Sequence, residues 1–240
     1  MTNFAVMNSN IRYQGHLSLC EVDIAGQQRI VRGRVLIVGA GGLGSPVALY
    51  LAAAGVGHLG LVDPDTVSLS NLQRQIAHTT ADIGRLKVDS ARDAMLAVNP
   101  GVAVTVYPQM LTSDNAAALL EDYDVVVDCT DSRCSRLAVN KACIDAERSM
   151  VFGAVSRFSG MAFTHIPDSA DYTTFFSAEA DDDAQPRSCA MTGILNTVVG
   201  ITGSIMATEV IKLLVGTGDL LTDRLLTFDA LTMTFSELRL

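Results

Sequence analysis

The first two thirds of the chain alternate between short apolar runs and longer segments in which apolar and polar positions are mixed. Short apolar runs predict buried strands of a parallel sheet, and the mixed segments predict helices that cover it. The alternation of the two predicts an α/β fold with a mostly parallel sheet and right-handed crossovers. The predicted strands are residues 35–38, 58–62, 102–107, 125–127 and 150–154, and the predicted helices are residues 45–54, 87–98, 113–120 and 136–147.

Local signals support two of these helices. Pro46 lies in the first turn of helix 45–54, where a proline removes no helical hydrogen bond. Ser113 or Asp114 is expected to cap the N-terminus of helix 113–120.

The last third departs from this rhythm. Residues 168–188 form an acidic, irregular segment, which predicts a mobile loop. An apolar helix is predicted over residues 194–215. Residues 225–228 and 233–240 then predict an antiparallel hairpin that turns at Asp229-Ala230.

Composition limits the partners. The chain has 26 acidic and 17 basic residues, and a formal charge of -9 would repel both nucleic acid and an anionic membrane surface. We therefore expect neither as a partner.

The first ten residues show no basic region followed by an apolar core, so we expect a cytoplasmic protein. Five cysteines without a C-x-x-C pair argue against a disulfide framework and a zinc knuckle.

The apolar helix at 194–215 raises the question of a membrane span. It carries Asn196, Glu209 and Lys212, and charged positions of this kind argue against one. A buried core helix and a homodimer interface both fit, since small residues such as Gly203 let another element pack closely.

A glycine-rich loop follows the first predicted strand. Residues 39–44 read Gly-Ala-Gly-Gly-Leu-Gly, and Asp63 follows at the end of the second strand. Gly39, Gly41 and Gly44 permit a tight turn, close approach to a phosphate and close packing of helix on sheet. Asp63 is placed where a carboxylate meets ribose hydroxyls. This pattern predicts a Rossmann-like nucleotide site, for a dinucleotide or for ATP.

Two downstream cations favour ATP. Arg74 lies in the polar segment 68–75, and Lys87 begins the next helix, so both could reach over the glycine loop. A triphosphate carries more charge than a diphosphate and calls for added cations. Each charge-assisted hydrogen bond would contribute about 1.5 to 3 kcal/mol. As isolated residues, they could equally be solvated surface charges.

A carboxylate points to a metal ion. The apolar strand at 125–127 runs into Asp128 and Asp131, and ligands of open α/β sheets bind outside the carboxyl ends of the strands. Asp131 is placed to hold Mg, which would offset phosphate charge. Asp128 could instead be a structural hydrogen-bonding residue, and either acid could cap a helix.

These motifs, taken in order, resemble the adenylyltransferases of the ThiF/MoeB/HesA family, bacterial relatives of ubiquitin-activating enzymes. The resemblance covers nearly the whole chain, and the block at residues 69–75 is its most specific part. The matching segments are Arg12-Tyr13, Gly26-Gln27, the Gly39 to Gly44 loop, Asp63-x-Asp65, Leu69-Ser70-Asn71-Leu72-Gln73-Arg74-Gln75, Gly84-x-x-Lys87, Asn99-Pro100 and Asp128-Cys129-Thr130-Asp131.

The resemblance implies a function. A homodimer would use ATP and Mg to adenylate the C-terminal glycine of a ubiquitin-like sulfur carrier protein, ThiS-like or MoaD-like, in thiamine-thiazole or molybdopterin synthesis. The glycine carboxylate is already ionised at neutral pH, so the reaction needs positioning and charge stabilisation but no general base. The implied division of the single domain is an N-terminal helical segment (1–34), a nucleotide-binding core (35–165), a flexible crossover loop (166–192) and the apolar helix with the hairpin (193–240).

The resemblance also implies roles for residues. Asp63 would hold the ribose, Arg74 and Lys87 would hold phosphates together with Asn71, and Asp131 would bind Mg. Cys189 matches the cysteine that joins covalently to the carrier in thiazole-type members, although an inert thiol is the alternative. The implied nucleotide-binding residues are Gly39, Gly41, Gly42, Asp63, Ser70, Asn71, Arg74, Lys87, Asp131 and Ser132.

The chain departs from the family pattern at three places. Zinc is expected to be absent, because residues 171–175 lack the first C-x-x-C pair and the sequence ends before the second. Gly15 stands where the family has an arginine that reaches the partner subunit's ATP, so adenylation could be slower unless Arg12 or another base compensates. Ser132 replaces an asparagine, which is a milder change.

Other functions stay open at this point. Cys189 and the lack of a rhodanese-type extension favour the thiazole branch slightly. An NAD-dependent oxidoreductase could use the same glycine loop, although Arg74, Lys87 and Asp131 argue against it. A further possibility is a member that binds a carrier or peptide without adenylating it, or that activates a different carboxylate.

Overall fold

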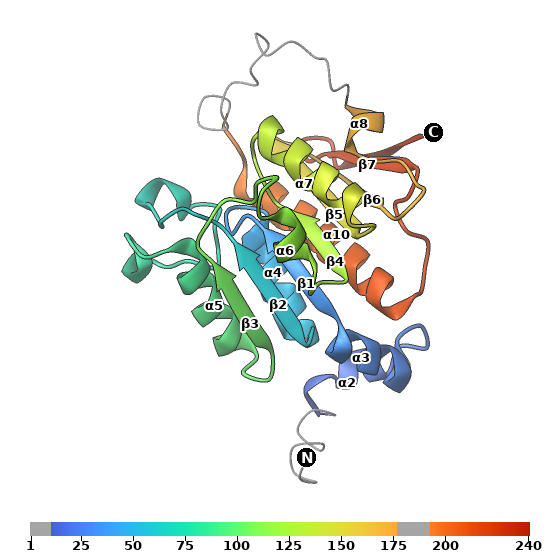
Figure 1. Cartoon of the computed structure of the whole chain (residues 1–240), viewed down its shortest axis with the longest axis horizontal. Helices are drawn as coiled ribbons and strands as arrows, with labels where there is room; N and C mark the ends of the chain where they lie inside the picture. The colour runs from blue at the N-terminus through green and yellow to red at the C-terminus, as the bar shows by residue number, and fades with distance from the viewer. Residues whose placement is uncertain (1–10, 177–192) are drawn as a thin grey trace.

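A computed structural model describes residues 11–176 and 193–240 of the chain. Its eight strands form one sheet in the order β3-β2-β1-β4-β5-β6-β7-β8 (Figure 1). The strands are β1 (Arg34–Val38), β2 (His58–Val62), β3 (Ala103–Tyr107), β4 (Val125–Asp128), β5 (Ser149–Ser156), β6 (Ser159–His165), β7 (Arg224–Asp229) and β8 (Thr234–Arg239).

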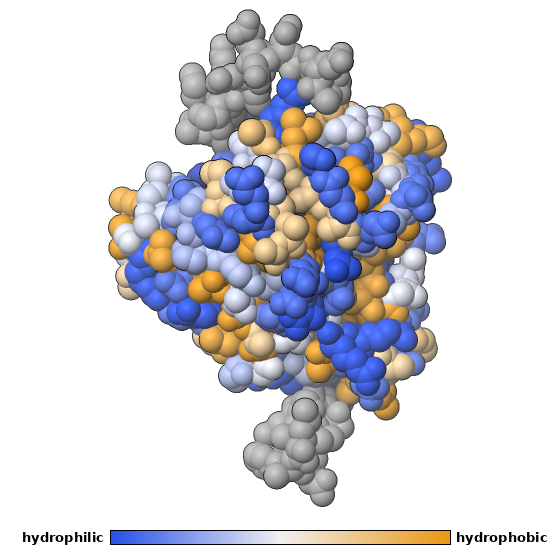
Figure 2. All heavy atoms as spheres, viewed as in Figure 1, coloured by the Kyte–Doolittle hydropathy of each residue, from blue (hydrophilic) through white to orange (hydrophobic). Residues whose placement is uncertain are grey.

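Helices cover both faces of this sheet. The helices of the described residues are α2 (Gln14–Leu17), α3 (Asp23–Arg32), α4 (Gly44–Ala54), α5 (Lys87–Val98), α6 (Ala116–Leu120), α7 (Arg133–Asp145), α8 (Tyr172–Phe175) and α10 (Asn196–Val215), with the 3-10 turns η1 (Leu69–Asn71) and η2 (Thr80–Asp82). One core cluster lies between the sheet and α4, α5 and α10, and the other between the sheet and α6 and α7. The outer face over α6 and α7 carries many hydrophilic residues interspersed with apolar ones (Figure 2).

The parallel half of the sheet contains the predicted strands. β3, β2, β1, β4 and β5 pair in parallel. The apolar runs of β2, β1, β4 and β5 are largely buried, whereas the edge strand β3 is partly exposed. The chain first winds outward from β1 to β3, then returns to β4 beside β1. The strand order therefore reverses between β1 and β4, and a crevice opens at their carboxyl ends, as in other doubly wound sheets. The predicted α/β fold with C-terminal antiparallel strands is confirmed.

The second half of the sheet is antiparallel. β6, which the sequence reading did not predict, pairs with β5 and carries the sheet on to β7 and β8. Its apolar run, Met161-Ala162-Phe163, is short and lacks the β-branched residues found in the parallel strands, so the sequence signal for a strand is weak. The predicted hairpin forms, although its turn lies over residues 230–233, just after the predicted position.

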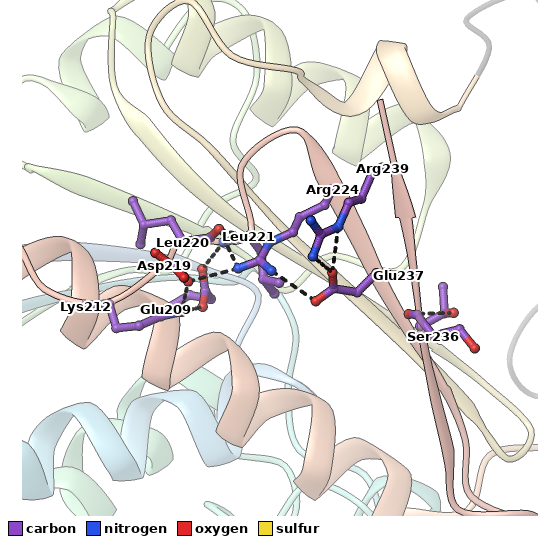
Figure 3. A network of polar contacts seen from close by, with 10 residues as sticks. Glu209, Lys212, Asp219, Leu220, Leu221, Arg224, Ser236, Glu237 and Arg239 are labelled. Atoms are coloured by element: carbon purple, nitrogen blue, oxygen red, sulfur yellow. Dashed lines mark hydrogen bonds and ion pairs between the residues drawn. The ribbon is translucent and has the colours of Figure 1, made fainter.

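A buried carboxylate joins α10 to this antiparallel half. Glu209 is 2% exposed, and its Oε2 accepts the hydroxyl of Thr164 at 2.7 Å and the N–H of Leu221 at 2.8 Å. Nearby, Arg224 on β7 pairs with Glu237 on β8 at 3.1 Å (Figure 3). Because the hydrogen bonds of Glu209 reach both β6 and the loop before β7, they fix α10 against this side of the sheet.

The helix α10 is long and apolar enough to span a membrane, but the core helix of a soluble protein can be so too. Here it packs against α4, β5 and β6, and 50% of its most apolar stretch is buried inside the protein. That packing is what a core helix requires. The absence of a membrane partner stays a prediction.

Two local predictions are wrong. α6 begins at Ala116, and neither Ser113 nor Asp114 caps it; Asn115 occupies the cap position and its side chain accepts the N–H of Thr112 at 2.8 Å. Residues 168–188 were predicted to be an irregular loop, but the part up to residue 176 contains an ordered turn, α8, and residues 177–188 lie outside the described residues. Aromatic packing explains that order, because Tyr172 is buried and its ring lies 5.3 Å from that of Phe152.

Asp82 ties together the loop that leads into α5. Its Oδ2 accepts the N–H and the hydroxyl of Thr79 at 2.8 and 2.7 Å, and Arg85 donates to its Oδ1 at 2.5 Å. The hydrogen bonds from Thr79, with a smaller contribution from Arg85, lower the pKa of Asp82 to about 2. An ionised carboxylate therefore holds this loop just before Lys87.

Replacing Asp82 by asparagine should lower the free energy of unfolding at neutral pH by at most about 2 kcal/mol. The unfolded chain takes up this proton near pH 3.8 and the native chain only near pH 2, so the wild type loses the stabilisation between about pH 4 and 2. Urea titrations at pH 7, 4 and 2 should show the difference between wild type and Asp82→Asn shrinking with acidification. A difference that is constant with pH would contradict this role.

Candidate nucleotide site

A cavity of about 350 Å³ lies at the carboxyl ends of β1, β2 and β4, where the strand order reverses. Its wall is built from the glycine loop, the segment after β2, the start of α5, and the turn from β4 into α7. The structure brings these predicted residues together there: Gly39, Gly41, Gly42, Asp63, Arg74, Lys87, Asp131 and Ser132. Residues distant in sequence thus converge on one cavity.

The path of the glycine loop requires glycine, which has no Cβ, at two positions, Gly39 and Gly44. Gly39 has a φ of 101°, and a Cβ there would lie 2.7 Å from the carbonyl oxygen of Cys129 at the end of β4. A Cβ on Gly44 would overlap the carbonyl oxygen of Gly39. Only glycine can take this path, because a left-handed φ and a backbone contact this close exclude larger residues.

The loop leaves amide donors at the start of α4. Within the described residues, the N–H groups of Gly41, Gly42 and Leu43 donate to no acceptor. Free N–H groups at a helix N-terminus carry partial positive charge and bind phosphate well. Gly41 and Gly42 also line the cavity, so these donors lie beside the space a phosphate would need.

Asp63 connects the glycine loop to the end of β2. Its Oδ2 accepts the N–H of Ala40 at 2.8 Å, and its Oδ1 accepts the N–H of Asp65 at 2.8 Å. Burial raises the pKa of this carboxyl group, while Lys87 and these two hydrogen bonds oppose the rise. Each oxygen has a further lone pair, which leaves capacity to accept a ribose hydroxyl.

Lys87 is a buried cation at the cavity wall. Its side chain is 8% exposed, and its Nζ pairs with Oδ2 of Asp65 at 2.7 Å, whereas Asp65 is 63% exposed. The backbone N–H of Lys87 also donates to the carbonyl of Asp65 at 2.9 Å. The lysine is therefore held in place, and its charge partner lies at the solvent edge, where a phosphate could replace it.

Arg74 contributes a second cation to the cavity wall, whereas Ser70 and Asn71, which were also predicted to bind the nucleotide, do not line it. The Nη1 of Arg74 donates to the carbonyl of Ser70 at 3.2 Å. Ser70 and Asn71 are not part of the cavity wall; Asn71 supports the turn, since its carbonyl accepts the N–H groups of Arg74 and Gln75. Their nucleotide contacts stay predictions.

The turn after β4 separates two acids. Asp128 is buried, its Oδ1 accepts the N–H and hydroxyl of Thr130 at 2.9 and 2.7 Å, and burial raises its pKa. Asp128 is therefore the structural hydrogen-bonding residue of the pair. Asp131 is exposed and lines the cavity, and it does not cap α7, because Ser132 does so through the N–H of Ser135 at 3.1 Å.

The donor set fits a phosphate-bound magnesium ion better than a protein-held one. Among the described residues no group of three or more His, Cys, Asp or Glu side chains could hold a metal. Mg needs only one or two carboxylates when substrate phosphates and water complete its octahedron. Asp131, at the cavity edge and close to the phosphate donors, is a carboxylate of that kind.

Sequence reasoning missed further parts of the wall. Arg136 adds a third cation; it lies over the ring of Phe152 at 5.4 Å and donates to the carbonyl of Thr130 at 3.3 Å. Gln75 is 4% exposed, and its Oε1 has no partner within the described residues. Of these two residues, Gln75 was easier to identify from the sequence than Arg136, because it lies in the family-specific block at residues 69–75. An apolar side completes the wall, with Leu43, Met110, Leu111, Val139, Val155, Ile194 and Val199.

Gly15, which stands where the family has its arginine, and Arg12, which was named as a residue that could compensate, both lie away from the cavity wall. Gly15 is exposed on α2, at the end of the molecule opposite the carboxyl ends of the strands (Figure 1). Arg12 donates to the carbonyl of Val98 at the far end of α5, at 3.0 Å. Arg12 therefore cannot serve the cavity of its own subunit. Cys189 lies outside the described residues.

Fold and site together define a nucleotide-binding α/β protein with its cavity at the switch point of a doubly wound sheet. The chain belongs to the ThiF family, whose model matches residues 13–240. The family resemblance inferred from the motifs is thus confirmed.

Named relatives agree with this assignment. The chain is 42% identical over 229 residues to the probable adenylyltransferase/sulfurtransferase MoeZ of Mycobacterium tuberculosis, covering 93% of this chain and 58% of that protein. It is 42% identical over 233 residues to the sulfur carrier protein adenylyltransferase of Thermus thermophilus, covering 95% of this chain and 86% of that protein. A crystal structure of PaaA shares the fold, with a TM-score of 0.81 and 22% identity over 100% of this chain and 76% of that one. The chain spans little more than half the length of several relatives.

Gly44→Ala should disrupt the loop, because the new Cβ would meet the Gly39 carbonyl oxygen. We expect a loss of about 1–3 kcal/mol in the free energy of unfolding, together with weaker nucleotide binding. The control is Gly15→Ala, since nothing lies within 4 Å of a Cβ there. Urea denaturation and calorimetric titration with ATP measure both effects. Equal stability of the two variants would contradict the close contact.

Proposed function

We propose that this protein is cytoplasmic and that it uses ATP and Mg to adenylate the C-terminal glycine carboxylate of a ubiquitin-like sulfur carrier protein. The observation that carries the proposal is the convergence of Arg74, Lys87 and Asp131 on the amides of the glycine loop. Cations beyond a helix N-terminus suit a triphosphate, whereas a dinucleotide's diphosphate needs fewer. The names of the relatives from Mycobacterium tuberculosis and Thermus thermophilus support an adenylyltransferase.

The site suits an in-line displacement at phosphorus. A carboxylate oxygen of the carrier attacks the α-phosphorus of ATP, the bond from that phosphorus to the bridging oxygen breaks, and pyrophosphate leaves. The products are a carrier acyl-adenylate and pyrophosphate. No proton transfer is needed, because a terminal carboxyl with a pKa of about 3.5 is ionised at neutral pH.

Each part of the cavity has a role in that displacement. Asp63 binds the ribose, while the amides of Gly41 and Gly42, with Lys87 and Arg74, bind phosphate oxygens and stabilise charge that develops on pyrophosphate. Magnesium held by Asp131 would neutralise further phosphate charge.

We propose that the protein acts as a homodimer through α10. Half-buried or exposed residues follow one side of that helix at helical spacing: Ile201, Ser204, Ile205, Thr208, Ile211 and Lys212. A partly covered stripe in which isoleucines alternate with polar residues can accept a second copy.

Zinc plays no part in this proposal. In place of the family's first cysteine pair stands a hydrogen-bonded turn, in which Asp171 Oδ1 accepts the N–H of Thr174 at 2.9 Å.

The carrier and its pathway are open between two branches. A ThiS-like carrier would place the protein in thiamine-thiazole synthesis, and a MoaD-like carrier in molybdopterin synthesis. Cys189 as a covalent link to the carrier would favour the first. ATP-pyrophosphate exchange measured with each purified carrier decides between them, and exchange with neither would contradict the proposed substrate class.

Asp131→Ala should reduce carrier-dependent, Mg-dependent ATP-pyrophosphate exchange by about 100-fold or more, the loss typical of one transition-state charge contact. Asp114→Ala, which removes an exposed acid outside the cavity, should leave exchange unchanged. Exchange that persists in Asp131→Ala would exclude Asp131 as the magnesium residue.

Gly15→Arg should increase exchange about tenfold or more if the family arginine acts across the dimer. The structure has room for it, because nothing lies within 4 Å of a Cβ at Gly15. The increase should vanish in the double variant Gly15→Arg with Lys87→Ala and reappear when that double variant is mixed with wild-type subunits. An increase that needs no partner subunit would contradict action across the dimer.

A further inference from the structure

A buried histidine lies directly behind the glycine loop. His78 is 6% exposed and is not part of the cavity wall. Its Nε2 lies 2.9 Å from the carbonyl oxygen of Ala40, and its Nδ1 lies 2.9 Å from the hydroxyl of Ser90 on α5. The ring therefore bridges the loop and the helix that carries Lys87.

The partners determine the proton positions on this ring. A carbonyl oxygen can only accept, so Nε2 of His78 must carry a hydrogen and donate it to Ala40. Burial, as the largest influence, lowers the pKa of His78, which keeps the imidazole neutral at physiological pH. The unprotonated Nδ1 then accepts the hydroxyl hydrogen of Ser90. One tautomer thus satisfies both ring nitrogens.

This bond has a consequence on the other side of the peptide unit. Because the Ala40–Gly41 peptide is planar and trans, the carbonyl of Ala40 and the N–H of Gly41 point in opposite directions. Holding the carbonyl toward His78 turns the Gly41 N–H away from it. On the preceding peptide, the N–H of Ala40 is held by Asp63 Oδ2 at 2.8 Å, so the loop cannot rotate freely there.

We propose that His78 is a positioning residue that aims the N–H of Gly41 at the phosphates of the bound nucleotide. Gly41 lines the cavity, and its N–H has no acceptor within the described residues. Without the histidine, the Ala40–Gly41 peptide could turn and present its carbonyl oxygen to the phosphates, replacing attraction by repulsion. The inference rests on the proposed function, since it needs a nucleotide phosphate in this cavity.

Calorimetric titration with two ligands tests this role. ATP with Mg has phosphates, and adenosine has the base and ribose alone. His78→Leu removes the donor and should weaken ATP binding about tenfold or more, while the Kd for adenosine stays within about twofold of wild type. His78→Gln carries an N–H donor at similar reach and should restore most of the ATP affinity. His58→Leu is the matched control. His58 is a half-buried histidine at the start of β2, at the end of the strand away from the cavity, and its ring is hydrogen-bonded to the hydroxyl of Thr105.

Several outcomes would overturn the inference. Wild-type affinity for ATP in His78→Leu would show that the donor is not needed, and an equal loss of ATP and adenosine would show a general structural role. If His78→Leu does not fold, the glutamine variant decides alone, since near wild-type ATP affinity supports the inference and a tenfold loss contradicts it. A wild-type protein that binds adenosine but not ATP would instead refute the proposed function.

Discussion

The whole site depends on one close approach of backbone to backbone. The glycine loop passes over the end of β4 so closely that a Cβ on Gly39 would lie 2.7 Å from the carbonyl oxygen of Cys129. This contact joins the ends of the two strands that flank the switch point, β1 and β4. It brings the start of α4, with its free amides, beside the turn that carries Asp131. If the loop lay further from β4, those amides and that carboxylate would not share one cavity.

The ion pair of Lys87 with Asp65 keeps the buried lysine stable and still leaves it able to bind an anion. Lys87 is buried, and an unpaired ammonium group in that position would be costly. Asp65 neutralises it from the solvent edge at 2.7 Å. Phosphate oxygens make strong charge-assisted hydrogen bonds. A bound triphosphate can therefore replace Asp65 as the partner of Lys87, and the Asp65 carboxylate is then solvated by water. Arg74 and Arg136 supply the remaining positive charge of the wall.

Sequence reasoning predicted the parts of the protein that follow from local pattern. The buried runs of β1, β2 and β4 were identifiable because burial on both faces leaves largely unbroken apolar residues. The helix at Lys87–Val98 was identifiable for another reason, since it mixes apolar and polar positions and is followed by Asn99-Pro100-Gly101. β6 was missed because its apolar run, Met161-Ala162-Phe163, is short and has no β-branched residue. Arg136 and His78 were missed for a different reason: each acts through a contact with a distant segment. His78, for example, meets Ala40 across 38 positions of sequence.

The central claim is that this cavity holds the triphosphate of ATP against the glycine loop. Isothermal titration calorimetry of the wild-type protein with ATP and Mg, and separately with NAD, tests it most directly. A triphosphate site here should give saturable binding of ATP with Mg that Lys87→Ala abolishes, and no binding of NAD. Binding of NAD without binding of ATP would exclude the triphosphate site and favour an oxidoreductase built on the same loop.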